Sequence, residues 1–357
     1  MVREYSSGLL RHASALGDRT GLVSHTPAAI AVPVRNEAER LPRFLSALAR
    51  QVDAPAFDLC LFFDNCDDGS EPLATGMLQR RLPFRMHVDR VGDGAPPNAG
   101  LARARAMQLA VEAAPSGIVL TTDADGEPAP DWVAANLRAL KRADVVAGRI
   151  ERTPGRASPM QDRLEAYYDR LHALRRLLDP VPWEDADTHH WTSAASLGMR
   201  AEIYRALGGF APLAAGEDAA FADAAARAGY RLRRDRRVAV RTSARRHGRA
   251  AHGFAATLAA FDGTAAMPLV HHPADEAWRY GLHARARRAH GGATHTLANL
   301  LRIPAAEVED VALECRNGEA FAARLVGAPP GGMRTVPLAQ AETLLAALEP
   351  NALEGAA

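Results

Sequence analysis

The chain has 357 residues, of which 48% are hydrophobic and 24% are charged, as expected for a soluble globular protein with room for one large domain or two. Its 43 Lys and Arg residues nearly balance its 42 Asp and Glu residues, so bulk charge selects neither nucleic acid nor an acidic membrane as a partner. Three cysteines without a C-x-x-C pair are too few for a disulfide framework, and a reducing cytoplasm fits them best.

Strands and helices alternate over the first half of the chain. After a leader at residues 1–28, hydrophobic periodicity predicts strands at 28–34, 57–64, 117–123 and 144–150, and helices at 36–51, 98–114 and 130–143. Asn36 is a candidate N-cap of the first of these helices. Such alternation predicts βαβ units and a largely parallel sheet.

The second half of the chain is less regular. We expect a long helix at 158–180, a short strand and a helix within 192–210, a helix at 218–228 and a strand at 237–242. Beyond about residue 265 the pattern becomes mainly helical. The sequence therefore predicts three parts, namely the leader (1–28), an α/β domain (29–264) and a mainly helical C-terminal region (265–357).

Acidic residues follow two of the predicted strands. Asp64 ends the strand 57–64, and Asp123 and Asp125 end the strand that reads "IVLTT". On a strand, residues two apart project to the same side, and two adjacent carboxylates repel each other unless a proton or a cation lies between them. A solvated turn is the alternative interpretation. Because ligands bind beyond the carboxyl ends of parallel strands, the position favours a binding site.

Six segments in order carry a family resemblance: "AVPVRNEAERLPRFLSAL", "FFDNCDDGS", "NAGLARARA", "TTDADGEPAPDWV", "LGMRAEIYRALGGF" and "GEDAAFADAAARAGY". Together they resemble the inverting glycosyltransferases of family 2, over roughly residues 28–250. The resemblance implies the GT-A fold, a Rossmann-like and mostly parallel central sheet flanked by helices. The C-terminal region would be a mainly helical extension of that fold.

The resemblance also implies a metal site and a catalytic base. Asp123 and Asp125 match the family's D-x-D motif, which holds Mg²⁺ or Mn²⁺ against the donor's phosphates, with Asp125 as the direct ligand. His247 is a candidate further ligand. Glu217 and Asp218 match the family's "ED" motif, in which Asp218 takes the position of the general base. Helix capping alone is the structural alternative for this acidic pair.

A second set of matches implies the nucleotide-sugar pocket. The positions that match are Pro33, Arg35, Asn36, Glu37, Asp64, Asn98, Gly100 and Arg105, with Asp123 and Glu217 contributing from the motifs above. Asp64 would accept a hydrogen bond from an N–H group of the base, which uracil and guanine both provide. Ala106 replaces the asparagine that the family has after the arginine, so no residue at this position can take the role of that asparagine. For Asn36 and Asn98, helix capping is the alternative.

Nine arginines gather in residues 231–249. They fit a nucleic-acid face, or a strand edge protected by charge. They also fit a basic loop over the leaving diphosphate, in which Arg245, Arg246 or Arg249 would bind phosphate oxygens.

These observations predict a metal-dependent inverting glycosyltransferase that moves a sugar from a nucleoside-diphosphate-sugar to an acceptor hydroxyl. A sugar nucleotidyltransferase and an arginine-rich RNA-binding protein are the alternatives, although no nucleic-acid partner is expected. No apolar run reaches about 18 residues, so no transmembrane segment is expected. We expect a cytoplasmic protein, soluble or peripheral at the membrane, and a homo-oligomer is compatible with the sequence. The nucleotide, the sugar, the acceptor and the choice between Mg²⁺ and Mn²⁺ stay open.

Overall fold

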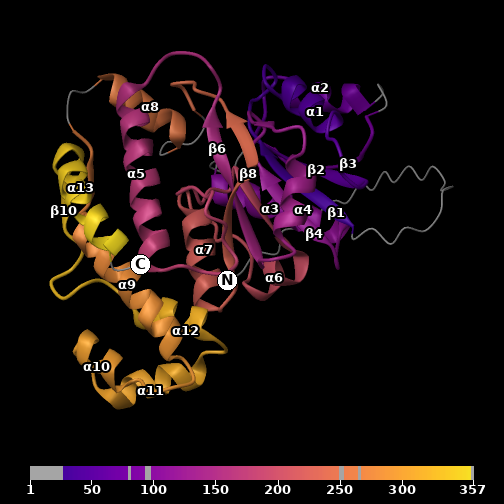
Figure 1. Cartoon of the computed structure of the whole chain (residues 1–357). Coiled ribbons are helices and arrows are strands. Elements are labelled where there is room, and N and C mark those ends of the chain that lie inside the picture. The colour runs from indigo at the N-terminus through magenta and orange to yellow at the C-terminus, as the bar shows by residue number, and fades with distance from the viewer. Residues whose placement is uncertain (1–26, 79–81, 93–97, 249–252, 264–266, 355–357) are drawn as a thin grey trace, which may run out of the picture.

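The computed structural model describes residues 27–78, 82–92, 98–248, 253–263 and 267–354. Residues 1–26 of the predicted leader lie outside these ranges. Within them, an eight-stranded sheet forms the centre of the molecule, in the spatial order β3-β2-β1-β4-β7-β6-β8-β5 (Figure 1). Its strands are β1 (Ala28–Val34), β2 (Phe57–Asp64), β3 (Arg85–Val91), β4 (Ile118–Thr122), β5 (Glu127–Pro128), β6 (Val145–Arg152), β7 (Ser196–Arg200) and β8 (Leu232–Thr242).

The predicted parallel sheet is confirmed for one half and is mixed in the other. β3, β2, β1 and β4 run parallel, so their carboxyl ends meet at one edge. β7 then runs antiparallel to both β4 and β6, while β6 and β8 are parallel to each other. Such a reversal was not predicted, because strand direction depends on pairing between distant segments.

Helices cover both faces of the sheet, and α9 and α13 of the C-terminal region lie beside α5 (Figure 1). The helices are α1 (Leu41–Ala49), α2 (Ser70–Leu78), α3 (Ala99–Ala113), α4 (Trp132–Ala139), α5 (Pro159–Leu178), α6 (Ala201–Ala206), α7 (Glu217–Arg227), α8 (Phe254–Gly263), α9 (Pro273–Ala289), α10 (His295–Leu301), α11 (Ala305–Glu314), α12 (Gly318–Leu325) and α13 (Leu338–Glu354).

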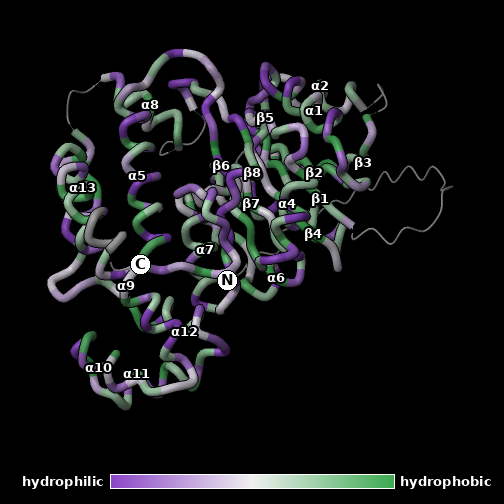
Figure 2. Tube along the Cα trace, viewed as in Figure 1, coloured by the Kyte–Doolittle hydropathy of each residue, from purple (hydrophilic) through white to green (hydrophobic). Residues whose placement is uncertain are grey.

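Alternation along β1 divides the core into two layers. Ile30 and Val32 belong to a cluster that packs under α1 and α4, and Ala29 and Ala31 belong to a cluster that packs under α3. Strands buried on both faces are hydrophobic throughout, whereas a strand nearer the sheet's edge tolerates charge. Figure 2 shows this contrast between β4 and the arginine-rich first half of β8. The core therefore fixes the strand ends on which the site is built.

The prediction that Asn36 caps the first helix is wrong. α1 begins only at Leu41, with Arg40 at the N-cap position and a proline in the first turn. Asn36 instead has a left-handed backbone, with φ of 52°. Its side-chain amide donates to Asp67 Oδ1 at 2.7 Å, and its carbonyl oxygen accepts from the Asp67 backbone N at 2.9 Å. These bonds join the loops that follow β1 and β2, which is why the helix starts later.

The C-terminal region is mainly helical, as predicted, with one feature that the sequence did not indicate. β9 (Leu269–His271) and β10 (Thr335–Pro337) form a short antiparallel ribbon. α13 packs on α5 through a shared hydrophobic cluster, and Arg170 forms an ion pair with Glu349 at 2.8 Å. α9 and α13 thus pack against α5, and the division at residue 264 remains a prediction. No helix in the described ranges is long and apolar enough to cross a membrane.

Two buried histidines lie between α5 and β8. His189 is 1% exposed, and neither ring nitrogen has a hydrogen-bond partner within the described chain. Burial, together with Arg234, lowers the pKa of His189 to about 3, and the same two causes lower the pKa of His172 well below its usual value. Both rings are therefore neutral in the folded protein.

This burial predicts acid sensitivity of the fold. In the unfolded chain a histidine has a pKa of about 6.5, so between pH 6.5 and 3 the unfolded state binds the proton that folded His189 rejects. The stability contribution is thus complete above about pH 6.5 and falls by up to about 1.4 kcal/mol per pH unit per histidine as the pH drops. Urea denaturation at about pH 6.5 and pH 5 should show this loss, and His189→Phe should reduce it. An equal loss in that variant would contradict the assignment.

Candidate active site

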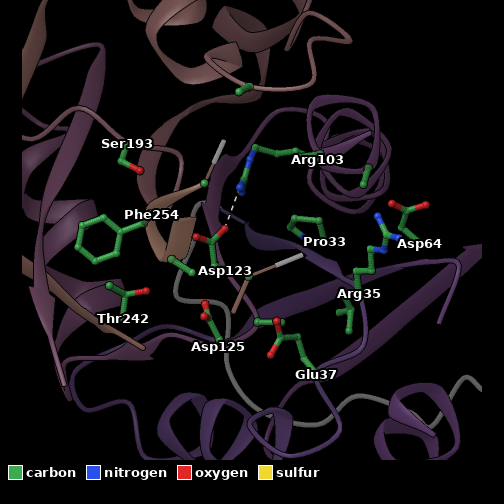
Figure 3. Close-up of a pocket in the computed structure, with 18 of the residues that line it drawn as sticks. Pro33, Arg35, Glu37, Asp64, Arg103, Asp123, Asp125, Ser193, Thr242 and Phe254 are labelled. Carbon is green, nitrogen blue, oxygen red and sulfur yellow. Dashed lines mark hydrogen bonds and ion pairs between the residues drawn. The ribbon is translucent and has the colours of Figure 1, made fainter. Parts of the chain in front are cut away.

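A cavity of about 640 Å³ opens at the carboxyl ends of β1, β2 and β4. Residues from these strand ends line it together with the start of α3, the segment before α7, the end of β8 and the start of α8. Figure 3 shows three parts in order across it, with Arg35 and Asp64 at one end, Asp123 and Asp125 in the centre, and Phe254 at the other end. The cavity thus has distinct ends on either side of an acidic centre.

Arg35 and Asp64 lie next to each other at the first end (Figure 3). Arg35 Nε is buried and has no hydrogen-bond partner among the described residues. Asp64 is buried and accepts a hydrogen bond from Asn65 Nδ2 at 2.8 Å, and burial raises the pKa of its carboxyl group. An unsatisfied donor beside a carboxylate acceptor suits a polar heterocycle that has both a carbonyl and an N–H group. Pro33 adds an apolar surface to this end.

Asp123 and Asp125 both line the cavity, but not by the predicted strand geometry. β4 ends at Thr122, and the chain then turns, with Gly126 N donating to the Asp123 carbonyl at 3.1 Å. Burial raises the pKa of Asp125 to about 7; Asp123 and Glu37 add to the rise, and Arg245 opposes it. The centre of the cavity is therefore a place where added positive charge is favourable.

Arg103 connects three of the predicted motifs from within α3. Its guanidinium donates to Asp123 Oδ1 at 2.7 Å, to Glu217 Oε1 at 3.1 Å and to Thr121 Oγ1 at 3.1 Å. The Arg103 side chain is 9% exposed. Burial alone would lower the pKa of this guanidinium, but Asp123 and Glu217 raise it above its usual value. Arg103 therefore holds the two acidic motifs at fixed positions.

Arg105 was predicted to line the nucleotide-sugar pocket, and Arg103 was not predicted. Arg105 is exposed on the outer side of α3, where its guanidinium contacts Gln108 at 3.4 Å, and it does not line the cavity. In a helix, Arg103 shares a face with Gly100 and Met107, three and four residues away, whereas Arg105 does not. This periodicity was the signal that would have identified Arg103.

Asp218 lies in the first turn of α7 and lines the cavity. Its carboxylate accepts hydrogen bonds from Ala194 N at 3.2 Å and from Ala219 N at 2.8 Å. Gly216 precedes the helix with φ of 81°, a backbone conformation that glycine adopts without strain. The Asp218 carboxylate therefore reaches the cavity, where a positioned carboxylate can act as a proton acceptor.

Glu217 lines the cavity too, but it is buried and paired with Arg103. On the opposite side, Glu37 forms a two-pronged ion pair with Arg245, at 2.8 Å and 2.5 Å. Both glutamates are therefore bound to arginines rather than free to meet a ligand.

The other predicted site residues within the described ranges lie outside the cavity lining. Asn98 caps α3, accepting from Leu101 N at 2.9 Å, so the helix-capping alternative describes it. Gly100 lies where a Cβ atom would come within 2.4 Å of the Leu213 carbonyl oxygen, which explains the glycine by packing. Arg246 pairs with Asp262, and His247 is exposed. Arg249 lies outside the described residues, and Asn36 joins two loops as described above.

The arginine-rich segment is neutralised by acids. Each of its eight arginines within the described ranges forms an ion pair with an Asp or Glu side chain; they are Arg231, Arg233, Arg234, Arg236, Arg237, Arg241, Arg245 and Arg246. A nucleic-acid face needs arginines that are free to meet phosphates. This pairing therefore disfavours the RNA-binding alternative.

The donor set of the acidic centre fits a hard divalent cation shared with a ligand. No group of three or more His, Cys, Asp or Glu side chains with metal-binding geometry occurs among the described residues. Mg²⁺, however, is usually held by one or two carboxylates together with substrate phosphates and water. Asp123 and Asp125 supply such a pair at a buried point that favours positive charge.

The comparison with protein families gives one match, to part of the chain. The family described as Glycosyl transferase family 2 matches residues 29–187, which contain β1 through β6 and the acidic centre. Residues 29–187 match a family 2 glycosyltransferase domain. No curated relative matches this glycosyltransferase at a significant level.

Solved structures with similar folds include a protein in complex with UDP-GlcNAc and a protein named as a mannosyltransferase. TarS 1-349 of S. aureus in complex with UDP-GlcNAc is 15% identical, with 81% of this chain and 80% of that chain covered and a TM-score of 0.47. The mannosyltransferase PcManGT of Pyrobaculum calidifontis, in complex with GDP-Man and Mn²⁺, is 21% identical, with coverages of 92% and 80% and a TM-score of 0.48. A longer TarS structure is 17% identical, with a TM-score of 0.43. The match covers 58% of this chain and 34% of that chain.

Proposed function

We propose that this glycosyltransferase is an inverting, metal-dependent enzyme that transfers a sugar from a nucleoside-diphosphate-sugar to an acceptor hydroxyl, with Asp218 as the general base. One observation carries the proposal: Asp218 and the pair Asp123 and Asp125 line the same cavity, whose far end holds Arg35 and Asp64. That arrangement supplies a base, an acidic centre for a cation and a polar end for a nucleobase in one enclosed space.

The order of the side chains along the cavity determines where the nucleobase, the diphosphate and the sugar of the donor bind. The nucleobase binds between Arg35 and Asp64, with the carboxylate accepting from an N–H group and the arginine donating to a carbonyl. The diphosphate then lies at the acidic centre, and the sugar faces Asp218. The acceptor enters from the end that Phe254 and Ser193 line (Figure 3). This assigns the donor to a uracil or guanine nucleotide class.

Asp218 removes the proton from the acceptor hydroxyl as its oxygen attacks the anomeric carbon. Attack from the side opposite the diphosphate inverts the configuration at that carbon. Arg103 keeps Asp123 in place and holds Glu217 one residue away from the base. A Mg²⁺ or Mn²⁺ ion held by Asp125 with Asp123 beside it would supply Lewis-acid stabilisation of the diphosphate's negative charge.

The anomer released in the absence of an acceptor tests inversion directly. Water then takes the acceptor's place, and ¹H NMR identifies the configuration of the sugar first released from UDP-glucose or GDP-mannose. The proposal expects the configuration opposite to the donor's. Release with the donor's configuration would contradict inversion and Asp218's role as the base.

Asp125→Asn tests the acidic centre by binding. Mutating a residue that only supports a metal ligand lowers metal affinity by about 10–100-fold. Loss of a direct carboxylate ligand should therefore weaken Mn²⁺-dependent binding of UDP or GDP by at least about 100-fold. Calorimetric titration with Mn²⁺ and with EDTA measures this loss. Asp131→Asn, an exposed aspartate paired with Arg138, serves as the matched control. Equal nucleotide affinity in EDTA and Mn²⁺ for the unmodified enzyme would overturn the metal dependence.

A further inference from the structure

Arg245 places a positive charge between two acids of the cavity. Its Nη2 lies 2.5 Å from Glu37 Oε1 and 3.2 Å from Asp125 Oδ2, and its Nη1 lies 2.8 Å from Glu37 Oε2. All three side chains are largely buried, with exposed fractions of 17%, 6% and 12% for Arg245, Glu37 and Asp125. The guanidinium thus bridges Glu37 and Asp125, and Asp125 is the carboxylate that would bind the metal in the proposed function.

Charge balance makes this bridge necessary in the ligand-free protein. Arg103 pairs with Asp123 and Glu217, so its charge is already shared between two acids. Within the described part of the chain, Arg245 is the basic side chain in ion-pair contact with Asp125. A buried carboxylate without a cation would be strongly unfavourable. Arg245 therefore takes the electrostatic place of a cation at Asp125.

A divalent metal at Asp125 conflicts with this arrangement. The metal needs carboxylate oxygens that the guanidinium contacts, and two positive centres a few ångströms apart in a partly buried site repel each other by several kcal/mol. Arg245 must therefore leave Asp125 when the metal binds, and it needs another anion to meet. A donor diphosphate at the same cavity is such an anion, since an arginine fork binds phosphate oxygens well.

We propose that Arg245 acts as an internal competitor of the metal at Asp125, and that nucleoside diphosphate relieves the competition by accepting the guanidinium. This inference rests on the proposed function. When the metal binds alone, breaking the contact between Arg245 and Asp125 costs free energy. When nucleotide binds as well, new contacts between Arg245 and the phosphates offset that cost. Because coupling between two ligands is reciprocal, each then binds more tightly in the presence of the other.

The neighbouring residue provides a matched control. Arg246 differs from Arg245 by one position and carries the same charge, but it pairs with Asp262 and does not line the cavity. Arg246→Gln therefore removes one positive charge from the same segment without freeing Asp125. Any effect of overall charge on Mn²⁺ binding appears in both variants, and only Arg245→Gln releases the carboxylate.

The test measures Mn²⁺ affinity by electron paramagnetic resonance at about pH 8, where exposed carboxylates are ionised. Without nucleotide, Arg245→Gln should bind Mn²⁺ more tightly than the unmodified protein by roughly 5–150-fold, the usual span of a coupling between sites. Arg246→Gln should match the unmodified protein. With UDP or GDP added, the gain in Mn²⁺ affinity should be smaller in Arg245→Gln than in the unmodified protein.

Equal or weaker Mn²⁺ affinity in nucleotide-free Arg245→Gln would overturn the inference. Arg245→Met, which keeps the aliphatic stem and removes the charge, carries the same test if the glutamine variant does not fold by circular dichroism. Arg245→Lys, which keeps the charge but loses the fork, should give an intermediate affinity. Failure of UDP and GDP to bind the unmodified protein would instead overturn the proposed function, and the nucleotide-free comparison would still decide this inference.

Discussion

Asp218→Asn is expected to lower turnover by about 10²–10⁴-fold, the usual contribution of a positioned general base. Asparagine keeps the size of the side chain and one of the two acceptor oxygens, so it retains the hydrogen bond from either Ala194 N or Ala219 N, and α7 should still form. It lacks the basic carboxylate that would take the acceptor's proton. The loss should therefore appear in kcat, with nucleotide affinity near that of the unmodified enzyme.

Asp223→Asn provides the control for this measurement. Asp223 lies on the same helix, is 69% exposed and makes only a long contact of 3.9 Å with Arg227. Steady-state kinetics should show an unchanged turnover for this variant. If Asp218→Asn lost nucleotide binding while keeping its rate at saturating donor, Asp218 would be part of the binding site and not the base.

Arg103→Gln is expected to destabilise the fold as well as the site. The change leaves Glu217, which is 9% exposed, and Asp123, which is 36% exposed, without their cation. Breaking a buried pair by removing one partner costs about 3–5 kcal/mol, and the exposure of Asp123 places the expected loss near the lower end. Urea denaturation measures the free energy of unfolding. Arg103→Lys should have a free energy of unfolding between those of the unmodified protein and Arg103→Gln.

Arg105→Gln is the matched control for Arg103→Gln. It lies on the same helix, is exposed, and its guanidinium contacts Gln108 at 3.4 Å. Substitutions at such positions usually change stability by less than about 0.5 kcal/mol. Equal stability of the two variants would contradict the assignment of Arg103 as the link between the acidic motifs.

The strands that position the site were readable from the sequence because their signal is local. β1 and β2 have the predicted bounds of 28–34 and 57–64, since each is mostly apolar and buried on both faces. Their order placed Asp64, Asp123 and Asp125 at one edge of a parallel sheet, and the cavity lies there. Hydrophobic periodicity and strand order therefore sufficed to locate the candidate site.

The contacts within the site were not readable in the same way, because they join residues far apart in the chain. Arg103 meets Glu217, and Arg245 meets Glu37, across separations of 114 and 208 residues. Asn36 looked like a helix cap because only its neighbours in sequence were considered, whereas its side chain binds Asp67. Motif matching located the acids, but it could not show which arginine balances each of them.

The position of β7 also determines what makes a complete folding unit. The family match ends at residue 187, yet β7 at Ser196–Arg200 lies between β4 and β6, which are both within the match. A fragment that stopped at residue 187 would leave the β7-facing edges of β4 and β6 unpaired, with Val119, Leu120 and Val146 beside them. Unpaired apolar edges favour aggregation, so during synthesis these two strands depend on a segment that leaves the ribosome later than either of them.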